Sequence, residues 1–131
     1  MKVLVVEDDF TSRKILQNVL SRYGECDVAV NGKEAVTAFK AAHLEGKPYD
    51  LICLDIMMPE MDGFEALSKI REVEAGFGLH GLSGVKVVMT TALGDYDSIM
   101  KSFRAQCEAY LIKPIDHAKL IKQIKDMGLI E

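Results

Sequence analysis

The amino-acid sequence predicts an α/β fold, in which a doubly wound sheet of five parallel strands carries helices on both faces. Short runs of Val, Leu and Ile alternate with longer segments of helical periodicity, which is the pattern of repeated βα units. The runs are continuously apolar, as in strands that are buried on both faces of a parallel sheet. The chain has 131 residues, 49% of them hydrophobic, so it can form a core without disulfides. We therefore expect a single domain that spans residues 1–131.

Five apolar runs are predicted to form the strands. The first is followed by Glu7 and Asp8 and the third by Asp55, so charged groups come directly after buried strands. Val, Ile and Leu dominate these runs, and turn residues or helical segments bound them. The predicted strands are Lys2–Val6, Cys26–Val30, Leu51–Leu54, Lys86–Thr90 and Ala109–Ile112.

Each predicted strand is followed by a segment with helical spacing of its apolar residues. Asn31 and Asp62 are each followed three residues later by Glu, which is the pattern of a capping box at the start of a helix. Pro48 ends the second helix, because its ring cannot continue a helical backbone. The predicted helices run over Thr11–Tyr23, from Asn31 to about Glu45, from Asp62 to about Ala75, from Asp95 or Asp97 to Cys107, and from Asp116 through Met127.

Charged and hydroxyl side chains follow the carboxyl ends of the predicted strands. In doubly wound folds the site lies beyond these ends, where the strand order reverses. If the strand ends converge, Glu7, Asp8 and Asp55 form one acidic pocket that contains Lys113. Carboxylates ~4 Å apart repel by roughly 4 kcal/mol at an effective dielectric of 20, so such a cluster favours a divalent cation. Ligands that are all oxygen, with room for several waters, suit Mg²⁺.

The composition excludes several classes of function. A net charge of −4 argues against direct binding to nucleic-acid phosphates, which requires clustered Lys and Arg. The three cysteines lack the spacing of metal ligands, and Cys53 is interpreted as a small buried hydrophobe. Acidic residues close to the start argue against a signal peptide, and no apolar stretch approaches the ~20 residues of a membrane span. We expect a soluble, cytoplasmic protein that binds neither nucleic acid nor membrane.

Four segments at the strand ends, taken in order, resemble the receiver domains of two-component response regulators, the CheY-like proteins. The resemblance covers nearly the whole chain and implies the strand order 2-1-3-4-5 of the flavodoxin and CheY type. It implies that Asp55 is the phosphoacceptor and that Glu7 and Asp8 form the acidic pair. The matching segments are Val3-Leu-Val-Val-Glu-Asp-Asp9, Asp50-Leu-Ile-Cys-Leu-Asp55, Met89-Thr-Thr-Ala92 and Tyr110-Leu-Ile-Lys-Pro114.

The resemblance also implies how the acidic pocket works. Asp8, Asp55 and the backbone carbonyl of Met57 are expected to bind Mg²⁺ directly, and Glu7 through water. Asp55 then takes a phosphoryl group from the phosphohistidine of a sensor histidine kinase or histidine phosphotransfer protein. Lys113 neutralises charge that develops on the phosphoryl oxygens. On this interpretation the protein catalyses its own phosphorylation and is not an enzyme acting on other substrates.

A switch is expected to follow phosphorylation. By the resemblance, the Thr91 hydroxyl donates to the new phosphoryl oxygens, and Tyr110 turns from an exposed to a buried position. This remodels the face formed by the fourth helix, fifth strand and fifth helix, which is expected to bind an effector protein or a second copy of the chain. The resemblance further implies a cis peptide bond between Lys113 and Pro114. We expect a stand-alone switch in chemotaxis or motility control or in a phosphorelay, and both pathways stay open.

The phosphoryl group is expected to be long-lived. In the family, the residues two positions after the phosphoacceptor and two positions after the switch Thr tune hydrolysis by orienting water. Here these residues are Met57 and Leu93, whose side chains cannot hydrogen-bond strongly. We therefore expect slow self-dephosphorylation.

Three other classes of protein share features with this sequence. A haloacid-dehalogenase-like phosphatase also uses a strand-end Asp with Mg²⁺ and Lys, but it requires a second Asp where this chain has Met57. A flavodoxin-like flavin carrier needs a first loop that binds phosphate, and Glu7, Asp8 and Asp9 would repel that group. A degenerate receiver that serves only as a scaffold is disfavoured because every expected pocket residue is present.

Overall fold

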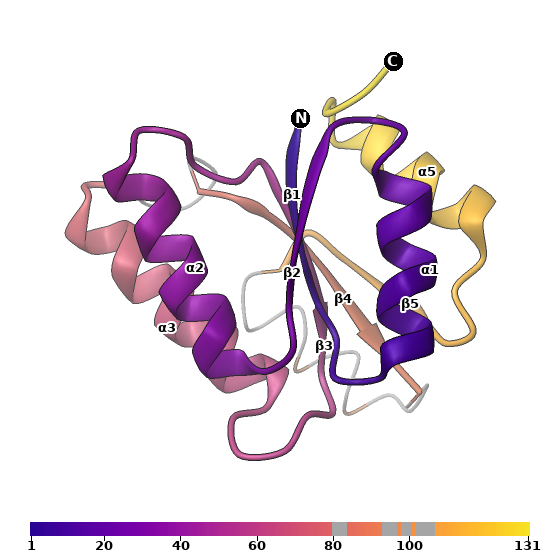
Figure 1. Cartoon of the computed structure of the whole chain (residues 1–131), viewed down its shortest axis with the longest axis horizontal. Coiled ribbons are helices and arrows are strands. Elements are labelled where there is room, and N and C mark those ends of the chain that lie inside the picture. Colours follow the sequence, from indigo (N-terminus) through magenta and orange to yellow (C-terminus); the bar gives the residue numbers. More distant parts are fainter. Residues whose placement is uncertain (80–83, 93–96, 98–100, 102–106) are drawn as a thin grey trace.

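The computed structural model describes residues 1–79, 84–92, 97, 101 and 107–131. Five parallel strands form one sheet in the order β2-β1-β3-β4-β5, which confirms the predicted fold class (Figure 1). The strands are β1 (Lys2–Val6), β2 (Glu25–Ala29), β3 (Leu51–Asp55), β4 (Lys86–Thr91) and β5 (Ala109–Ile112). The described helices are α1 (Phe10–Leu20), α2 (Gly32–Leu44), α3 (Gly63–Gly76) and α5 (His117–Asp126). The helix predicted from Asp95 or Asp97 to Cys107 lies largely outside the described residues.

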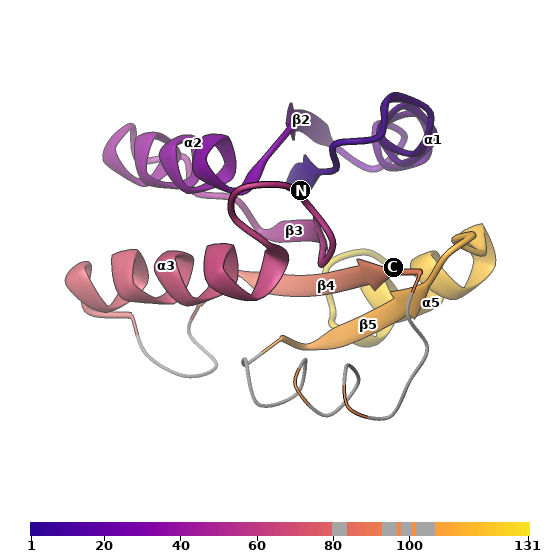
Figure 2. The same ribbon diagram turned by 90° about the horizontal axis from the view of Figure 1, so that it is seen from below.

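The helices cover the two faces of the sheet in pairs. Figure 2 shows α2 and α3 on one face and α1 and α5 on the other. Side chains alternate along β1 accordingly, because Leu4 and Val6 pack toward α2 and α3 while Val3 and Val5 pack toward α1 and α5. Cys53 is 1% exposed and belongs to the second of these cores, as predicted for a small buried hydrophobe. The apolar runs thus form a sheet that is buried on both faces.

Capping side chains set the starts of the helices. Oδ1 of Asn31 accepts a hydrogen bond from the Glu34 amide at 2.8 Å, and Asp62 accepts one from Glu65 at 2.9 Å. These two contacts confirm the predicted helix starts. Oδ1 of Asp116 likewise accepts from the amides at the start of α5.

The first helix is shorter than its pattern predicts. It ends at Leu20, not Tyr23, and β2 begins one residue before the predicted position. The chain must reverse here, and the Tyr23 amide donates to the Leu20 carbonyl in the turn. A Cβ atom at Gly24 would lie 1.9 Å from the Met1 carbonyl oxygen, so only glycine fits where the chain passes the backbone of Met1. The helical spacing of apolar residues therefore extends to Tyr23, although the helix itself ends at Leu20.

A buried network of charges joins α3 to β4 and β5. Glu74 is 2% exposed and accepts hydrogen bonds from Arg71 at 2.7 Å and from the Val85 amide at 2.6 Å. Arg71 also donates to the Val85 carbonyl and lies 3.5 Å from Glu108, which in turn accepts from the Val87 amide. The network pairs charges that would otherwise be buried alone.

Within the part of the chain described here, no helix has both the length and the apolar character needed to cross a membrane.

Candidate functional site

The carboxyl ends of β1 and β3 bring three carboxylates together. Val6 pairs with Leu54 across the two strands, so Glu7 and Asp55 lie next to one another beyond that pair. One oxygen each from Glu7, Asp8 and Asp55 lies within 4.8 Å of the others. Glu7 and Asp55 are buried, whereas Asp8 is exposed. The cluster therefore has a buried floor and a side that is open to solvent.

Lys113 reaches this cluster from the end of β5. Its Nζ lies 2.8 Å from Oε2 of Glu7 and 3.3 Å from Oδ2 of Asp55. Its backbone amide donates to the Thr91 carbonyl at 2.7 Å, which fixes the strand end from which the side chain extends. The sequence predicted that Lys113 lies in the acidic pocket, and it did not predict that the shorter ion pair of Lys113 is with Glu7.

The crowding of charges changes the proton affinity of the site. Burial, followed by the charge of Glu7, raises the pKa of Asp55 to about 7, although Lys113 opposes the shift. Burial alone would lower the pKa of Lys113, but its contacts with Glu7 and Asp55 outweigh this and raise the pKa above its ordinary value. Lys113 is therefore an ammonium ion at neutral pH, whereas Asp55 without a metal is only partly ionised.

Local hydrogen bonds orient the carboxylates. The Met57 amide donates to Oδ1 of Asp55 at 3.3 Å, and the Asp9 amide donates to Oε1 of Glu7 at 3.3 Å. Asp9 is also the N-cap of α1, because its Oδ2 accepts from the Ser12 amide at 2.8 Å. Hydrogen bonds from the backbone and the side chain of Ser12 lower the pKa of Asp9. Asp9 thus belongs to the helix start, and Asp8 to the carboxylate cluster.

Arg13, on α1, donates hydrogen bonds to the backbone of Glu7 and Asp8. Its Nη1 donates to the backbone carbonyl of Glu7 at 3.0 Å and to that of Asp8 at 3.4 Å. No sequence pattern assigns this role to Arg13, because a cation in the first turn of a helix usually points into solvent. Its position one turn after Asp9 is the only signal available in advance.

The remaining predicted residues lie around the cluster. Thr91 is 1% exposed at the end of β4 and pairs with Ile112 of β5. Tyr110 is half-buried and packs against the core on the side of α2 and α3. The Lys113–Pro114 peptide bond is cis. The Met57 side chain is 59% exposed, and Leu93 lies outside the described residues.

The donor chemistry of the cluster fits a magnesium ion. Its side-chain ligands are all carboxylate oxygens, which a hard divalent cation prefers to softer ligands. The cluster has three carboxylates and one neighbouring ammonium, that of Lys113, which pairs with Glu7 and Asp55, so negative charge remains in excess. The exposed Asp8 leaves one side of the cluster open for waters on the metal.

Comparison with known proteins places the chain in a family. The family model described as the response regulator receiver domain matches residues 3–125. The chain belongs to this family. The receiver domain is 34% identical over 127 residues to chemotaxis protein CheY of Halobacterium salinarum, which covers 96% of this chain and 95% of that protein. It is 38% identical over 128 residues to hybrid signal transduction histidine kinase L of Dictyostelium discoideum, and this match covers 97% of the chain but only 7% of the kinase.

Solved structures agree with the family and its fold. The receiver domain of the histidine kinase CKI1 from Arabidopsis thaliana, complexed with Mg²⁺ and BeF₃⁻, is similar with a TM-score of 0.82 and 29% identity. The match covers 97% of this receiver domain and 89% of the CKI1 chain. The comparisons do not support a haloacid-dehalogenase-like phosphatase, and the fold class and strand order that the sequence resemblance implied are confirmed.

Proposed function

We propose that this receiver domain is a signalling switch that accepts a phosphoryl group on Asp55 from a phosphohistidine of a kinase or phosphotransfer protein. The observation that carries the proposal is the meeting of Glu7, Asp8, Asp55 and Lys113 at the carboxyl ends of three strands. A buried nucleophile beside a cation, with an open acidic side, is what phosphoryl transfer needs.

The reaction moves one phosphoryl group between two nucleophiles. A carboxylate oxygen of Asp55 forms the new P–O bond while the P–N bond to the histidine breaks, and the imidazole keeps that electron pair. Lys113 Nζ, 3.3 Å from Oδ2 of Asp55, is within reach of an oxygen of the incoming group. Its ammonium offsets the negative charge there, so most of the rate comes from positioning and electrostatics.

Asp8, Asp55 and the Met57 carbonyl would hold Mg²⁺ directly, and Glu7 would hold it through water. When bound, the ion supplies positive charge that screens the carboxylates from the phosphoryl oxygens. Glu7 also fixes Lys113 by the 2.8 Å ion pair, so that the ammonium stays beside Asp55 before the substrate arrives. The complex of the CKI1 receiver domain with Mg²⁺ and BeF₃⁻ supports the assignment of the metal.

The output is proposed to pass through Thr91 and Tyr110. Thr91 ends β4, and its carbonyl accepts from the Lys113 amide, so β4 and β5 are joined beside the site. Movement of Thr91 toward a phosphoryl group would change the space available to Tyr110, which is half-buried. The face that includes β5 and α5 would then bind an effector protein or a second copy. The fourth helix of this face falls outside the described residues.

Two pathways share this phosphotransfer step. Likeness to a chemotaxis protein over nearly the full length of both chains supports a role in chemotaxis or motility control. Likeness to part of a hybrid histidine kinase supports a role in a phosphorelay. Asp55 is the acceptor in both pathways, and only the partner differs.

Acetyl phosphate tests the proposed acceptor without a kinase. Intact-mass spectrometry should show one added phosphoryl group when Mg²⁺ is present and none in EDTA. Asp55→Asn should abolish the addition, whereas Asp126→Asn, an exposed carboxylate at the end of α5, should leave it unchanged. An Asp55→Asn protein that is still modified would overturn the assignment.

A further inference from the structure

Thr90 on β4 carries a buried hydroxyl that the proposed phosphotransfer does not use. The residue is 1% exposed, and its Oγ1 has no hydrogen-bond partner among the residues that the structure describes. A hydroxyl that loses its contact with water on folding and finds no partner destabilises the folded state. Valine has nearly the same shape without this cost, so a hydroxyl at this position indicates a role other than packing.

The register of the sheet places Thr90 next to Asp55. The two residues are paired across β3 and β4, and the Ile56 amide donates to the Thr90 carbonyl at 2.9 Å. Neighbouring strands lie about 4.8 Å apart, and the side chains of paired residues project on the same face. Thr90 and Asp55 therefore lie side by side near the carboxyl ends of their strands.

Both side chains lie on the face of the sheet that α1 and α5 cover. Cys53 and Val88, which precede Asp55 and Thr90 by two residues, belong to the core on that face. Side chains two residues apart on a strand share a face, so Asp55 and Thr90 continue the same rows. Thr91, one residue further along β4, leaves the strand on the other face and is a separate hydroxyl.

The Lys113 side chain passes the same position. Leu111 of β5 pairs with Thr90, and Lys113 follows two residues later on the same face. Because β4 lies between β3 and β5, this side chain crosses β4 to bring Nζ within 3.3 Å of Oδ2 of Asp55. Thr90 therefore lies between Asp55 and the strand that carries Lys113.

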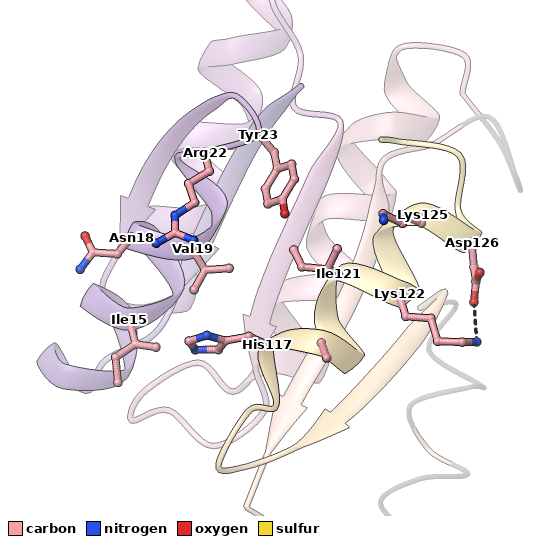
Figure 3. Close-up of a pocket in the computed structure, with 11 residues that line it drawn as sticks. Ile15, Asn18, Val19, Arg22, Tyr23, His117, Ile121, Lys122, Lys125 and Asp126 are labelled. Carbon is pink, nitrogen blue, oxygen red and sulfur yellow. Dashed lines mark hydrogen bonds and ion pairs between the residues drawn. The ribbon is translucent and has the colours of Figure 1, made fainter. Parts of the chain in front are cut away.

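The large cavity on this face of the sheet does not supply a partner for the hydroxyl. The cavity has a volume of about 730 Å³ and lies between α1 and α5 (Figure 3). Its lining side chains come from these two helices and from the turn after α1, and they include Val19, Tyr23 and Ile121. Thr90 does not line the cavity, so water there cannot hydrogen-bond to its hydroxyl. The neighbouring Asp55 is the acceptor that the register brings beside it.

Both carboxyl oxygens of Asp55 have donors in the unphosphorylated site. Oδ1 accepts from the Met57 amide at 3.3 Å, and Oδ2 lies 3.3 Å from Lys113 Nζ. In the proposed phosphotransfer the Lys113 ammonium turns to the phosphoryl oxygens, so the carboxyl group of Asp55 loses one of these donors. The Thr90 hydroxyl lies on the adjacent strand and can replace it.

We propose that the Thr90 hydroxyl donates a hydrogen bond to the carboxyl group of phosphorylated Asp55 and thereby speeds the loss of the phosphoryl group. The inference rests on the proposed role of Asp55 as the phosphoacceptor and adds a catalytic residue to its dephosphorylation. Thr90 then contributes to the time for which the switch stays on.

The chemistry of hydrolysis gives the direction of the effect. The oxygen of a water molecule forms a bond to phosphorus while the P–O bond to Asp55 breaks, and the Asp55 oxygen keeps the electron pair. Both hydrogens of the water remain with the released phosphate. Negative charge therefore grows on the Asp55 carboxyl group in the transition state, and a donor beside it stabilises the transition state more than the aspartyl phosphate.

Two variants at position 90 test the hydroxyl. Thr90→Val keeps the shape of the side chain and removes the donor, whereas Thr90→Ser keeps the donor. Each protein is phosphorylated with acetyl phosphate and Mg²⁺, desalted, and followed over time by intact-mass spectrometry at fixed Mg²⁺. Thr90→Val should lengthen the phosphoryl lifetime by about fivefold or more, as expected for one hydrogen bond to a developing charge. Thr90→Ser should stay within about twofold of the unaltered protein.

Thr37→Val provides the matched control. Thr37 is exposed on α2, on the other face of the sheet, so removal of its hydroxyl should leave the lifetime unchanged. Thermal unfolding in EDTA gives a second readout that needs no phosphoryl group. Thr90→Val should raise the melting temperature by about 3 °C, because an unpaired buried hydroxyl is removed, and Thr90→Ser should not raise it.

Several results would overturn the proposal. Equal lifetimes of Thr90→Val and the unaltered protein would remove the role of Thr90 and leave Asp55 as the acceptor. Equal changes in Thr90→Val and Thr90→Ser, or in Thr90→Val and Thr37→Val, would show that the donor at position 90 does not act. No phosphoryl group on the unaltered protein would overturn the acceptor and the role of Thr90 together. If Thr90→Val does not fold, Thr90→Ala removes the same donor and should lengthen the lifetime in the same way.

Discussion

The ammonium of Lys113 lies 2.8 Å from Oε2 of Glu7, and this contact is shorter than the 3.3 Å between the same nitrogen and Oδ2 of Asp55. Glu7 is fully buried, so the ion pair stabilises a charge that has no access to solvent. Asp55 has the longer contact, and burial followed by the charge of Glu7 raises its pKa to about 7. The ion pair with Glu7 therefore keeps the Lys113 ammonium beside Asp55, while the charge on Asp55 is only partly offset.

Removal of the ammonium should destabilise the fold. Lys113→Met leaves Glu7 and Asp55 buried side by side, and we expect a loss of about 2 kcal/mol at pH ~8, because breaking a buried pair leaves an uncompensated charge. The loss should shrink at pH ~5, since a shared proton can replace the ammonium. Urea unfolding in EDTA measures both values.

The exposed pair on α5 provides the control for this variant. Lys122 and Asp126 have side chains that are 77% and 58% exposed, so Lys122→Met should change stability by less than about 0.5 kcal/mol. Equal losses in the two variants would show that Glu7 does not depend on Lys113.

The raised pKa of Asp55 should appear as a dependence of stability on pH. The group titrates at about 7 in the folded chain, against its ordinary 3.8, so the folded state binds more protons between these values. The free energy of unfolding should therefore fall as the pH rises from about 4 to about 7. Asp55→Asn lacks this titration and should be more stable than the unaltered protein by roughly 2 kcal/mol above pH 7. A difference that does not vary with pH in EDTA contradicts the assignment.

Magnesium should stabilise the folded protein through Asp8. Any ligand that binds only the folded state adds about 2.7 kcal/mol at a hundred times its Kd. Asp8→Ala should lose most of this Mg²⁺-dependent increment in thermal unfolding. Asp9→Ala should lower the stability by about 1 kcal/mol, because Asp9 caps α1, yet should keep the increment. Loss of the increment in Asp9→Ala and not in Asp8→Ala would contradict the proposed ligand set.

The network around Arg71 should matter for stability and not for phosphotransfer. Arg71→Met leaves the buried Glu74 and the nearby Glu108 without the guanidinium that lies between them, and we expect a loss of about 3 kcal/mol. Because the network lies at the amino-terminal ends of β4 and β5, acetyl phosphate should still modify the folded variant. A folded Arg71→Met protein that cannot be modified would connect the network to the site.

The phosphoryl lifetime should depend on residue 57. Met57 is exposed beside Asp55 and cannot position water strongly, so Met57→Asn should shorten the lifetime by orienting an attacking water. Loss of label from the phosphorylated proteins, followed over time at fixed Mg²⁺, measures the rate. Equal decay in the two proteins would count against this role of Met57.

Much of the carboxylate site could be predicted because its residues follow strand ends. Continuous apolar runs that stop at Glu7 and Asp55 indicate parallel strands, and the carboxyl ends of parallel strands meet at one edge. The strand order itself came from the family resemblance, since periodicity does not decide which strands are neighbours. The sequence did not predict the ion pair between Lys113 and Glu7, because the side-chain positions of Glu7 and Asp55 depend on packing.

Other features were hidden by their likeness to ordinary surface patterns. Arg71 and Glu74 are spaced like an exposed helix pair, yet Glu74 continues the buried stripe of Leu67 and Ile70 on α3. An acidic residue on an apolar stripe was the available signal that a buried partner was needed. The partner Glu108 lies far along the chain, so only the fold could identify it.

The most direct measurement of the central claim is the position of the phosphoryl group. Borohydride reduces an aspartyl phosphate to homoserine, and peptide mapping by mass spectrometry then locates the reduced residue. After treatment with acetyl phosphate and Mg²⁺, we expect homoserine at position 55 and none in the EDTA control. Homoserine at Asp8 or at another carboxylate, or none at all despite folded protein and Mg²⁺, would contradict the account.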